Sequence, residues 1–507
     1  MTQPTTGRGR ASARRRPSTS RSSTARPASR PTSHGQRTPS AKAPSALDLA
    51  LAASLERQYP ELGSFADLGL PQALITALAK HGIDAPFAIQ TRAMPDAMAG
   101  RDVLGRAQTG SGKTLAFGLP MLSRLHRPET RTRRTANAPR ALVLVPTREL
   151  AQQVSTALNP LAEALGQRVT SVVGGAPYGR QIDALSRGVD VLVATPGRLI
   201  DLIERRACRL DQVEVCVLDE ADYMADLGFL PVVTKLLEMT PAGGQRLLFS
   251  ATLDRGVAGL VDKFLTDPAV HAVAPATASV AAMTHKVFTV RKDDKPTIAA
   301  ELGSRPARTL FFVRTKHGAD RLARQLGNAG VDAAAIHGNL AQNARQRALA
   351  AFADGSTRVL VATDVAARGI HVDGVDLVVH YDPPNDHKDY LHRSGRTARA
   401  GETGLVVNLV QPDQLRDVAK LHADARVEPT VDVVHPGHPA VREVATSGEP
   451  IVVIPSRPVI GDRSGGDRSG SRGSSNRRYR GGPSSSKIWN VDKVMSVISS
   501  SPRSVCS

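Results

Sequence analysis

The stretch "VLGRAQTGSGKTLAF", residues 103–117, decides how this 507-residue chain folds. A short apolar strand that ends near Leu104 is followed by a glycine-rich loop and then by a helical pattern. The glycines of such a loop let backbone N–H groups approach phosphate oxygens, and the N-terminus of the following helix favours the anion. Lys113 can reach the terminal phosphates, and the Thr114 hydroxyl can ligate magnesium. The stretch therefore predicts a phosphate-binding loop between a strand and a helix, although Ala107 stands where the pattern usually has its first glycine.

A second stretch, "VCVLDEADYMADLGF" at residues 215–229, brings carboxylates to the end of a buried strand. An acidic pair in this position often only starts a helix, because Asp and Glu suit helix N-termini. In a chain with a phosphate-binding loop, however, Asp219 can hold the magnesium, directly or through water. Glu220 can then orient and deprotonate the attacking water. The two stretches together predict hydrolysis of a nucleoside triphosphate.

Short β-branched runs such as "ALVLV", "DVLVA", "TLFFV" and "DLVVHY" alternate with Ala- and Leu-rich helical patterns. This alternation favours α/β layers around parallel strands that are buried on both faces. Thr147 and Thr315 end similar strands, Thr195 and Thr363 end identical "VLVAT" strings, and both pairs are 168 residues apart. We interpret this echo as a duplicated fold whose threonines lie at ligand-binding sheet edges.

Eight motifs occur in order along the chain: "AQTGSGKT", "PTREL", "GG", "TPGR", "DEAD", "SAT", "TDVAARG" and "HRSGRTARAG". With this set in this order, the chain resembles the DEAD-box RNA helicases between about residues 64 and 425. The resemblance implies an α/β fold of two RecA-like parallel-sheet domains joined by a linker, with ATP and RNA bound in the cleft between them. The implied boundaries are a disordered tail at 1–46, the first domain at 47–270, a linker at 271–286, the second domain at 287–430, and a C-terminal extension with a basic tail at 431–507.

The resemblance also implies an ATP site with bound Mg²⁺. Phe65 would stack on the adenine and Gln90 would hydrogen-bond its edges, although Phe87 and Ala88 stand where the family usually has Thr-Pro. Taken alone, Gln90 would by default cap a helix. The phosphate loop would comprise Ala107, Gln108, Thr109, Gly110, Ser111, Gly112, Lys113 and Thr114, with Thr114 and Asp219 as metal ligands.

Both halves of the chain contain residues similar to the family's RNA contacts. They are Thr147, Arg148, Gly174, Gly175, Thr195 and Arg198 in the first half, and Arg314, Thr315, Gly338, Gln342, Arg345 and Thr363 in the second. Such contacts go to phosphates and 2′-OH groups, so they recognise the RNA backbone and not the base sequence. Taken singly, each of these residues is more often a strand-end turn or a surface charge. The shared offset favours the functional interpretation for the threonines.

The remaining motifs would couple the two ligands. Ser250 and Thr252 resemble residues that relay the nucleotide state to the RNA through hydrogen bonds with the "DEAD" motif. His392 would pair with that acidic motif. Arg396 and Arg399 resemble arginine fingers, which reach the γ-phosphate only when the two domains close.

The basic charge is concentrated at the two ends of the chain. Of the formal net charge of +19, residues 1–46 carry +10 and residues 457–507 carry +7, which leaves about +2 for the middle. Both ends are rich in Arg, Gly, Ser and Pro, which predicts disorder and attraction to polyanions, with a merely solvating linker as the alternative. Residues 487–507, "KIWNVDKVMSVISSSPRSVCS", break this pattern and contain the only tryptophan.

Three scattered cysteines, Cys208, Cys216 and Cys506, match neither a disulfide framework nor a metal cluster, which favours a reducing cytoplasm. No apolar stretch reaches membrane-spanning length, and the N-terminus lacks the apolar core of a signal peptide. We therefore expect a cytoplasmic monomer with no membrane partner. RNA is the expected partner, with ribosomal precursor particles or an RNA-decay assembly as further candidates.

The expected function is that of an ATP-dependent RNA helicase, which hydrolyses ATP to unwind or remodel RNA duplexes locally. An RNA-annealing chaperone that acts through its basic tails and a DNA-directed helicase are the alternatives. The chain departs from the family at Ala398, where glycine is common, and at His371, where an aspartate commonly contacts the ribose. The second departure predicts weaker or altered ATP binding.

Overall fold

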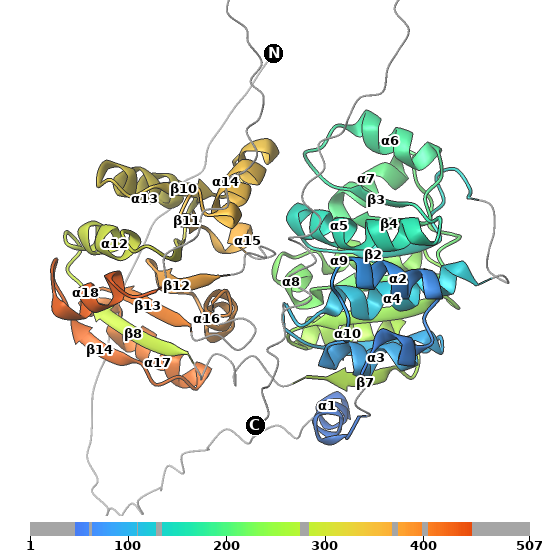
Figure 1. The fold of residues 1–507 in the computed structure, drawn as a ribbon, viewed down its shortest axis with the longest axis horizontal. Helices are drawn as coiled ribbons and strands as arrows, with labels where there is room; N and C mark the ends of the chain where they lie inside the picture. The colour runs from blue at the N-terminus through green and yellow to red at the C-terminus, as the bar shows by residue number, and fades with distance from the viewer. Residues whose placement is uncertain are drawn as a thin grey trace, which may run out of the picture. The chain divides into compact units, whose positions relative to one another are not determined.

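The computed structural model describes residues 46–59, 63–108, 110–127, 134–273, 283–367, 374–397 and 404–448. The predictions that fall outside these ranges concern the disorder of both basic tails, the middle of the linker, and the roles of Thr109, His371, Ala398 and Arg399. The described chain forms two α/β lobes, each built around one sheet with helices on both of its faces (Figure 1). None of the helices described is both long and apolar enough to cross a membrane.

The first lobe contains a seven-stranded sheet in the order β3-β4-β2-β5-β6-β1-β7, with every pairing parallel. Its strands are β1 (Val103–Arg106), β2 (Ala141–Leu144), β3 (Val169–Val172), β4 (Val191–Ala194), β5 (Val215–Asp219), β6 (Gln245–Ser250) and β7 (Ala269–Ala272). Every residue of β2, β4, β5 and β6 is buried. Burial on both faces explains why these strands are continuous apolar runs and not alternating patterns.

Helices cover both faces of this first sheet. They are α1 (Ala46–Glu56), η1 (Phe65–Leu68), α2 (Gln72–Lys80), α3 (Ala88–Met98), α4 (Lys113–His126), α5 (Arg148–Ala164), α6 (Tyr178–Ser186), α7 (Pro196–Glu204), α8 (Ala221–Asp226), α9 (Leu230–Glu238) and α10 (Arg255–Phe264). One hydrophobic cluster joins the sheet to α2 through α5, and a second joins its other face to α6 through α10.

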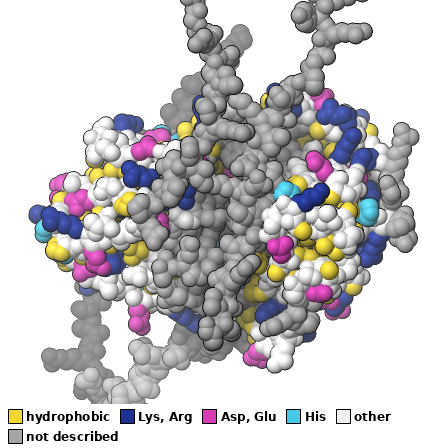
Figure 2. Space-filling view, in the orientation of Figure 1, with side chains coloured by type: hydrophobic (Ala, Val, Ile, Leu, Met, Phe, Trp, Pro, Cys, Tyr) yellow, Lys and Arg dark blue, Asp and Glu magenta, His cyan; other side chains and the backbone are white. Residues whose placement is uncertain are grey.

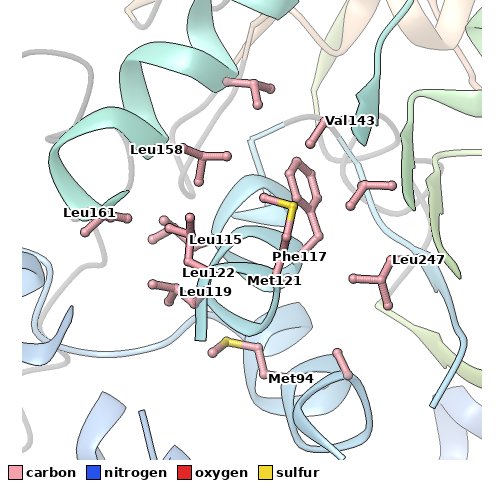
Figure 3. Close-up of a cluster of buried hydrophobic side chains, with 14 of the residues drawn as sticks. Met94, Leu115, Phe117, Leu119, Met121, Leu122, Val143, Leu158, Leu161 and Leu247 are labelled. Carbon is pink, nitrogen blue, oxygen red and sulfur yellow. The ribbon is translucent and has the colours of Figure 1, made fainter. Parts of the chain in front are cut away.

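Helix α4 lies at the centre of the first of these clusters. Its apolar side chains pack against Leu158 and Leu161 of α5, Met94 of α3, and Val143 and Leu247 of the sheet (Figure 3). Because α4 is held on several sides, its N-terminus and the loop that precedes it occupy a defined place at the end of β1.

The second lobe repeats this strand order. Its sheet runs β10-β11-β9-β12-β13-β8-β14, which is the order of the first sheet with each number raised by seven, and all of its pairings are parallel. The strands are β8 (Thr284–Thr289), β9 (Arg308–Phe312), β10 (Ala333–Ile336), β11 (Val359–Ala362), β12 (Val375–His380), β13 (Leu405–Val410) and β14 (Thr430–Val433). The duplicated fold predicted from the 168-residue offset is therefore confirmed.

The helices of the second lobe are α12 (Lys295–Gly303), α13 (Lys316–Asn328), α14 (Gln342–Asp354), α15 (Asp364–Ala367), α16 (His387–Ser394), η3 (Pro412–Gln414), α17 (Leu415–Ala425) and α18 (Pro439–Ala445). Strand β14 and helix α18 extend this lobe beyond residue 430, where the sequence motifs end. Strands β7 and β8 likewise extend into the two ends of the range 271–286, so regular structure occupies part of the expected linker.

Charged side chains of both signs are interspersed over the described surface that Figure 2 displays. This mixture agrees with the small net charge of about +2 between the two basic ends of the chain.

Candidate nucleotide and nucleic-acid sites

The glycine-rich loop leaves the end of β1 and enters α4, as the sequence predicts. Gly110 and Gly112 both have φ of +88°. A Cβ on Gly112 would collide with the side-chain amide nitrogen of Gln90 and would lie 2.8 Å from Cδ2 of Phe87, so only glycine fits there. The Ser111 hydroxyl donates to the carbonyl of Gln108 at 2.7 Å, which closes the turn before the helix.

Lys113, the first residue of α4, faces the carboxylates of the "DEAD" motif. Its Nζ lies 2.8 Å from Oε1 of Glu220 and 3.9 Å from Oδ1 of Asp219, and the lysine is 5% exposed. Burial acts to lower the pKa of Lys113, but the charges of Glu220 and Asp219 outweigh it, so the pKa is raised overall. The ammonium is therefore charged, and the two carboxylates hold it at the mouth of the phosphate loop.

Asp219 is the last residue of β5, and Glu220 caps α8. Burial raises the pKa of Asp219 to about 7, with the Glu220 charge adding to the effect and the Lys113 charge opposing it. Glu220 has φ of +55°, a left-handed backbone that non-glycine residues rarely adopt. Backbone strain of this kind is concentrated at functional sites, so it supports a functional role for this turn.

The donor set of this site fits a magnesium ion. Asp219 offers a carboxylate and Thr114 a hydroxyl, and Mg²⁺ prefers oxygen ligands. Burial is the main cause of the raised pKa of Asp219, the Glu220 charge adds to it, and a divalent cation at this carboxylate would oppose both effects. Among the residues described, no group of three or more His, Cys, Asp or Glu side chains could hold a metal. Mg²⁺ usually needs no such cage, because one or two carboxylates together with substrate phosphates bind it.

Asp222, the last residue of the "DEAD" motif, links this site to the "SAT" motif on β6. Its Oδ2 accepts hydrogen bonds from the backbone N–H of Thr252 at 2.8 Å and from the Thr252 hydroxyl at 2.9 Å. The Asp222 N–H donates to Oγ of Ser250 at 3.1 Å, and the Ser250 hydroxyl donates to the carbonyl of Thr252 at 2.7 Å. The Ser250 carbonyl also accepts from the N–H of Ala107 at 3.1 Å, so this network reaches the phosphate loop.

Asp222 has no predicted role of its own from the sequence, although it belongs to the "DEAD" motif. The available signal was the third carboxylate of "DEAD", close behind the catalytic pair. Asp222 is 2% exposed, and a buried carboxylate needs donors of this kind to offset its desolvation.

Of the two residues predicted to recognise adenine, Gln90 contacts the phosphate loop and Phe65 is buried in the core. Oε1 of Gln90 accepts from the N–H of Phe87 at 2.8 Å, and its Nε2 donates to the carbonyl of Gly112 at 3.0 Å. Gln90 therefore caps α3 and also ties that helix to the phosphate loop. Phe65 is 2% exposed and belongs to the core cluster of the first lobe. The roles of both residues in adenine recognition remain predictions.

The RNA-contact candidates of the first lobe gather at one edge of its sheet, where β2, β3 and β4 end. Thr147 caps α5 by accepting from the N–H of Leu150 at 3.2 Å. The Arg148 guanidinium lies against Gly174 and Gly175, and a Cβ on Gly175, whose φ is +78°, would lie 2.8 Å from Cζ of Arg148. The structure thus brings together the "PTREL" and "GG" motifs, which are separate in the sequence.

Arg198 completes this edge of the first lobe. Thr195 precedes the first residue of α7, and the Arg198 side chain donates to the carbonyl of Ala176 at 2.9 Å. Its guanidinium lies over the ring of Tyr178, 4.1 Å from the ring centroid. These contacts support the loop that follows β3, so Arg198 has a structural role beside its predicted contact with RNA.

The second lobe places its own candidates at the matching edge, after β9, β10 and β11. Thr315 caps α13 by accepting from the N–H of Gly318 at 3.0 Å, as Thr147 caps α5. Thr363 donates its N–H to the carbonyl of Ile336, just as Thr195 donates to Val172. The remaining candidates are Arg314 at the end of β9, Gly338 after β10, and Gln342 and Arg345 in α14.

The last motif lies on and after α16. Arg393 forms a two-pronged ion pair with Asp364, Nε to Oδ1 at 2.5 Å and Nη2 to Oδ2 at 2.8 Å. Nε of Arg396 donates to the carbonyl of His392 at 3.3 Å. Arg399 lies outside the described residues. The sequence analysis did not single out Arg393, although it stands between His392 and Arg396 in "HRSGR"; its ion pair fastens this motif to "TDVAARG".

Similarity to known proteins identifies the family to which this chain belongs. The family described as "DEAD/DEAH box helicase" matches residues 87–260, and "Helicase conserved C-terminal domain" matches residues 294–401. The chain is 40% identical over 396 residues to the ATP-dependent RNA helicase RhlB of Xanthomonas oryzae, an alignment that covers 76% of this chain and 69% of that protein. The chain belongs to the DEAD-box ATP-dependent RNA helicases.

Two further similarities place the chain within this DEAD-box family. It is 40% identical over 402 residues to the chloroplastic DEAD-box ATP-dependent RNA helicase 3B of Zea mays, across 78% of this chain and 53% of that one. The chain thus spans about half the length of this relative. The structure of S. cerevisiae Dbp5 bound to RNA and ADP BeF3 matches with a TM-score of 0.66 and 28% identity, over 76% of this chain and all of Dbp5. The two RecA-like sheets predicted from the motifs are confirmed.

Proposed function

We propose that this chain hydrolyses ATP and uses the cycle to unwind or remodel short RNA duplexes. The observation that carries the proposal is the contact of 2.8 Å between Lys113 and Glu220 at the phosphate loop. A strand end, a helix start and a strained turn converge there on a charged lysine and two carboxylates. Membership of the DEAD-box family supports the same chemistry.

Lys113 and Glu220 neutralise each other in the nucleotide-free protein. A triphosphate that enters the loop offers the Lys113 ammonium a stronger anionic partner, together with backbone N–H groups at the start of α4. The exchange of partners releases the Glu220 carboxylate, which can then orient a water molecule and take its proton. The base is therefore held inactive until its substrate arrives.

Mg²⁺ would be held by Asp219 and Thr114 together with the phosphates, and it would supply neutralisation of the phosphate charge. Asp222 transmits the state of the site. Because it accepts two hydrogen bonds from Thr252, a shift of the "DEAD" turn moves the "SAT" turn with it. Arg396, and Arg399 beyond the described residues, would deliver positive charge to the γ-phosphate.

RNA is the proposed polynucleotide. The candidate contacts form two matching sheet edges, each with a helix capped by threonine and an adjacent arginine. Backbone N–H groups at capped helix starts suit phosphates, and they carry no information about base sequence. The RNA bound in the Dbp5 structure supports this assignment. Ribosomal precursor particles and RNA-decay assemblies remain the proposed settings, and sequencing of RNA crosslinked in cells would distinguish them.

We also propose a reducing, cytoplasmic location. The described thiols, Cys208 and Cys216, are buried and form no disulfide. Burial raises the pKa of Cys208 to about 12, which keeps it in the unreactive thiol form.

The proposal is tested by measuring ATP hydrolysis and strand separation with a short RNA duplex and with a DNA duplex of the same sequence. We expect hydrolysis to be stimulated by RNA, and strand separation to require both ATP and RNA. The Glu220→Gln variant is the matched control, because it keeps the shape of the site. Strand annealing that is unchanged in this variant would point instead to an RNA chaperone, and equal activity on DNA would point to a DNA-directed helicase.

A further inference from the structure

One face of the second sheet is left open at its edge. Helix α17 packs on β8 and β13 through Val287, Val410 and Val418, but it does not cover β14. A hollow of about 710 Å³ lies beside it, lined by β8, α17 and the turn into β14. We refer to this hollow and the adjoining face of β14 as the α17 groove.

The α17 groove exposes valines that a parallel sheet normally buries. Val431 is 55% and Val433 78% exposed, and they project from the same face of β14 because they are two residues apart. Val431 is paired in register with Val287 of β8, whose side chain is buried under α17. Strands of parallel sheets are usually covered on both faces, so this face lacks a helix.

The opposite face of the same strands is closed. Phe288 of β8 lies in a cluster with Val441 and Val444 of α18 and with Val434 just after β14. The open face is therefore a local feature of one side and not a frayed sheet edge. The described chain ends shortly after α18, at Gly448.

The sequence beyond Gly448 contains a segment that suits this face. Residues 488–498, "IWNVDKVMSVI", stand apart from the Arg- and Gly-rich tail before them. Five of the seven apolar residues in this segment recur with helical spacing, at positions i, i+3, i+6, i+7 and i+10. The five are Ile488, Val491, Val494, Met495 and Ile498, whereas Trp489 and Val497 fall on other sides of the predicted helix. No charged residue interrupts this stripe, because Asp492 and Lys493 fall on other sides of the predicted helix.

Length and reach agree with the α17 groove. An eleven-residue helix is about 16 Å long, close to the roughly 20 Å of the six-residue strand β8. Residues 449–487 connect Gly448 to the segment, and for a Gly- and Ser-rich chain of this length the expected root-mean-square end-to-end distance is about 35 Å. A lobe of this size has a radius of gyration of about 15 Å, so the segment can reach any side of it. Tethering also gives an effective concentration of the order of millimolar.

We propose that residues 488–498 form an amphipathic helix that packs in the α17 groove of the same chain and completes the helical layer over β8 and β14. This contact fastens the end of the basic tail to the second lobe. The Arg-rich part of the tail then becomes a loop closed at both ends. It holds its positive charge near the second lobe, where that charge can meet an RNA strand.

The only tryptophan of the chain, Trp489, reports directly on this segment. The test uses the full-length protein without RNA and measures the fluorescence anisotropy of Trp489, which falls on the side of the predicted helix away from the stripe and so reports the tumbling of the segment. In the double variant Val431→Asp with Val433→Asp, we expect anisotropy to fall toward that of a free tail. Leu49→Asp on α1 is the matched control, because Leu49 is a similarly exposed apolar residue, at 58%, in the other lobe. It should leave the anisotropy unchanged.

Met495→Asp probes the contact from the other side and leaves the lobe itself intact. We expect it to reproduce the anisotropy of the groove variant, whereas Ser496→Asp, which falls off the stripe, should not. Equal anisotropy in the wild type and in both charge variants would overturn the proposal. So would anisotropy that rises with protein concentration alongside a dimeric mass, because the segment would then occupy the groove of a second copy.

Discussion

Asp222 and Thr252 are joined by two hydrogen bonds to one carboxylate oxygen, of 2.8 Å from the backbone N–H and 2.9 Å from the hydroxyl. The two residues are 30 positions apart in the sequence and belong to different motifs. The pair therefore connects the turn that presents Glu220 to the turn that follows β6. The two hydrogen bonds lie where the predicted relay from the nucleotide site to the RNA would need a link, and that role stays a prediction.

Replacing Thr252 with valine should weaken this connection while keeping the shape of the side chain. The lost hydrogen bond leaves part of the buried Asp222 carboxylate unsatisfied, at a cost of about 1–3 kcal/mol. We expect ATP hydrolysis to persist within about tenfold, a change of about 1.4 kcal/mol in the barrier, while strand separation falls by more. Parallel assays of both activities check this. A proportional loss of the two would show that Thr252 serves hydrolysis alone.

Glu220→Gln should separate binding from chemistry. The amide cannot take the proton of the attacking water, so turnover should drop by about 10²–10⁴-fold. ATP and RNA affinities should remain near those of the wild type, because Lys113 and the loop are retained. Lys113→Ala should instead weaken nucleotide binding itself. Equilibrium titration together with steady-state ATPase distinguishes the two variants, and wild-type turnover in Glu220→Gln would refute the assignment of the base.

The raised pKa of Asp219 predicts how the nucleotide-free protein responds to pH. Because the folded-state pKa, about 7, exceeds the ordinary value near 3.8, the carboxyl favours the folded state at low pH, and this contribution is lost as the pH rises through 7. Asp219→Asn removes the ionisation. We expect it to raise the thermal unfolding temperature at about pH 8, by about 2–4 °C per kcal/mol gained, and to have less effect at about pH 5. If the gain in unfolding temperature of the variant over the wild type instead grew toward low pH, ionisation of Asp219 would not be its cause.

The folding stability of the second lobe should depend on pH in the opposite sense. Burial lowers the pKa of His422 to about 4 and that of His380 well below 6.5, and both histidines lie beside Tyr390. Because the folded-state pKa values of these histidines are depressed, the neutral histidines stabilise the folded state above about pH 6.5. This stabilisation is lost as the pH falls toward about 4. The glutamine side chain introduced by His422→Gln cannot take up a proton, so this variant should be more stable than the wild type in acid. Unfolding curves of both proteins, measured from about pH 4 to about pH 8, test this because the range spans both the folded and the ordinary histidine pKa.

The basic ends of the chain should control how RNA affinity depends on salt. The middle carries about +2, while residues 1–46 and 457–507 carry +10 and +7. Each phosphate contact contributes about −0.7 to the log–log slope for single strands, so removing both ends should flatten the slope. ATPase at saturating RNA should barely change, because the catalytic candidates remain. Identical slopes would show that the ends do not bind RNA, and a collapse of saturated ATPase would show a further role.

The sequence by itself determined the chemistry and the duplication. The phosphate loop, "DEAD" and the 168-residue offset are local strings, and short-range geometry dictates what each can do: glycines admit a phosphate, and strand ends present side chains to a ligand. Spacing alone therefore predicted that Lys113, Asp219 and Glu220 act together. It also predicted the matching sheet edges that end in Thr147 and Thr315.

Only the tertiary structure decided which distant side chains meet. Strands β5 and β6 pair in parallel, so the turns that follow them lie at the same edge of the sheet, and there the Asp222 carboxylate meets Thr252. Contacts between elements were likewise invisible in the sequence: the Gln90 side chain donates to the carbonyl of Gly112, and the sheet face at Val433 is open. Contacts of this kind depend on packing between whole layers, which no local pattern encodes.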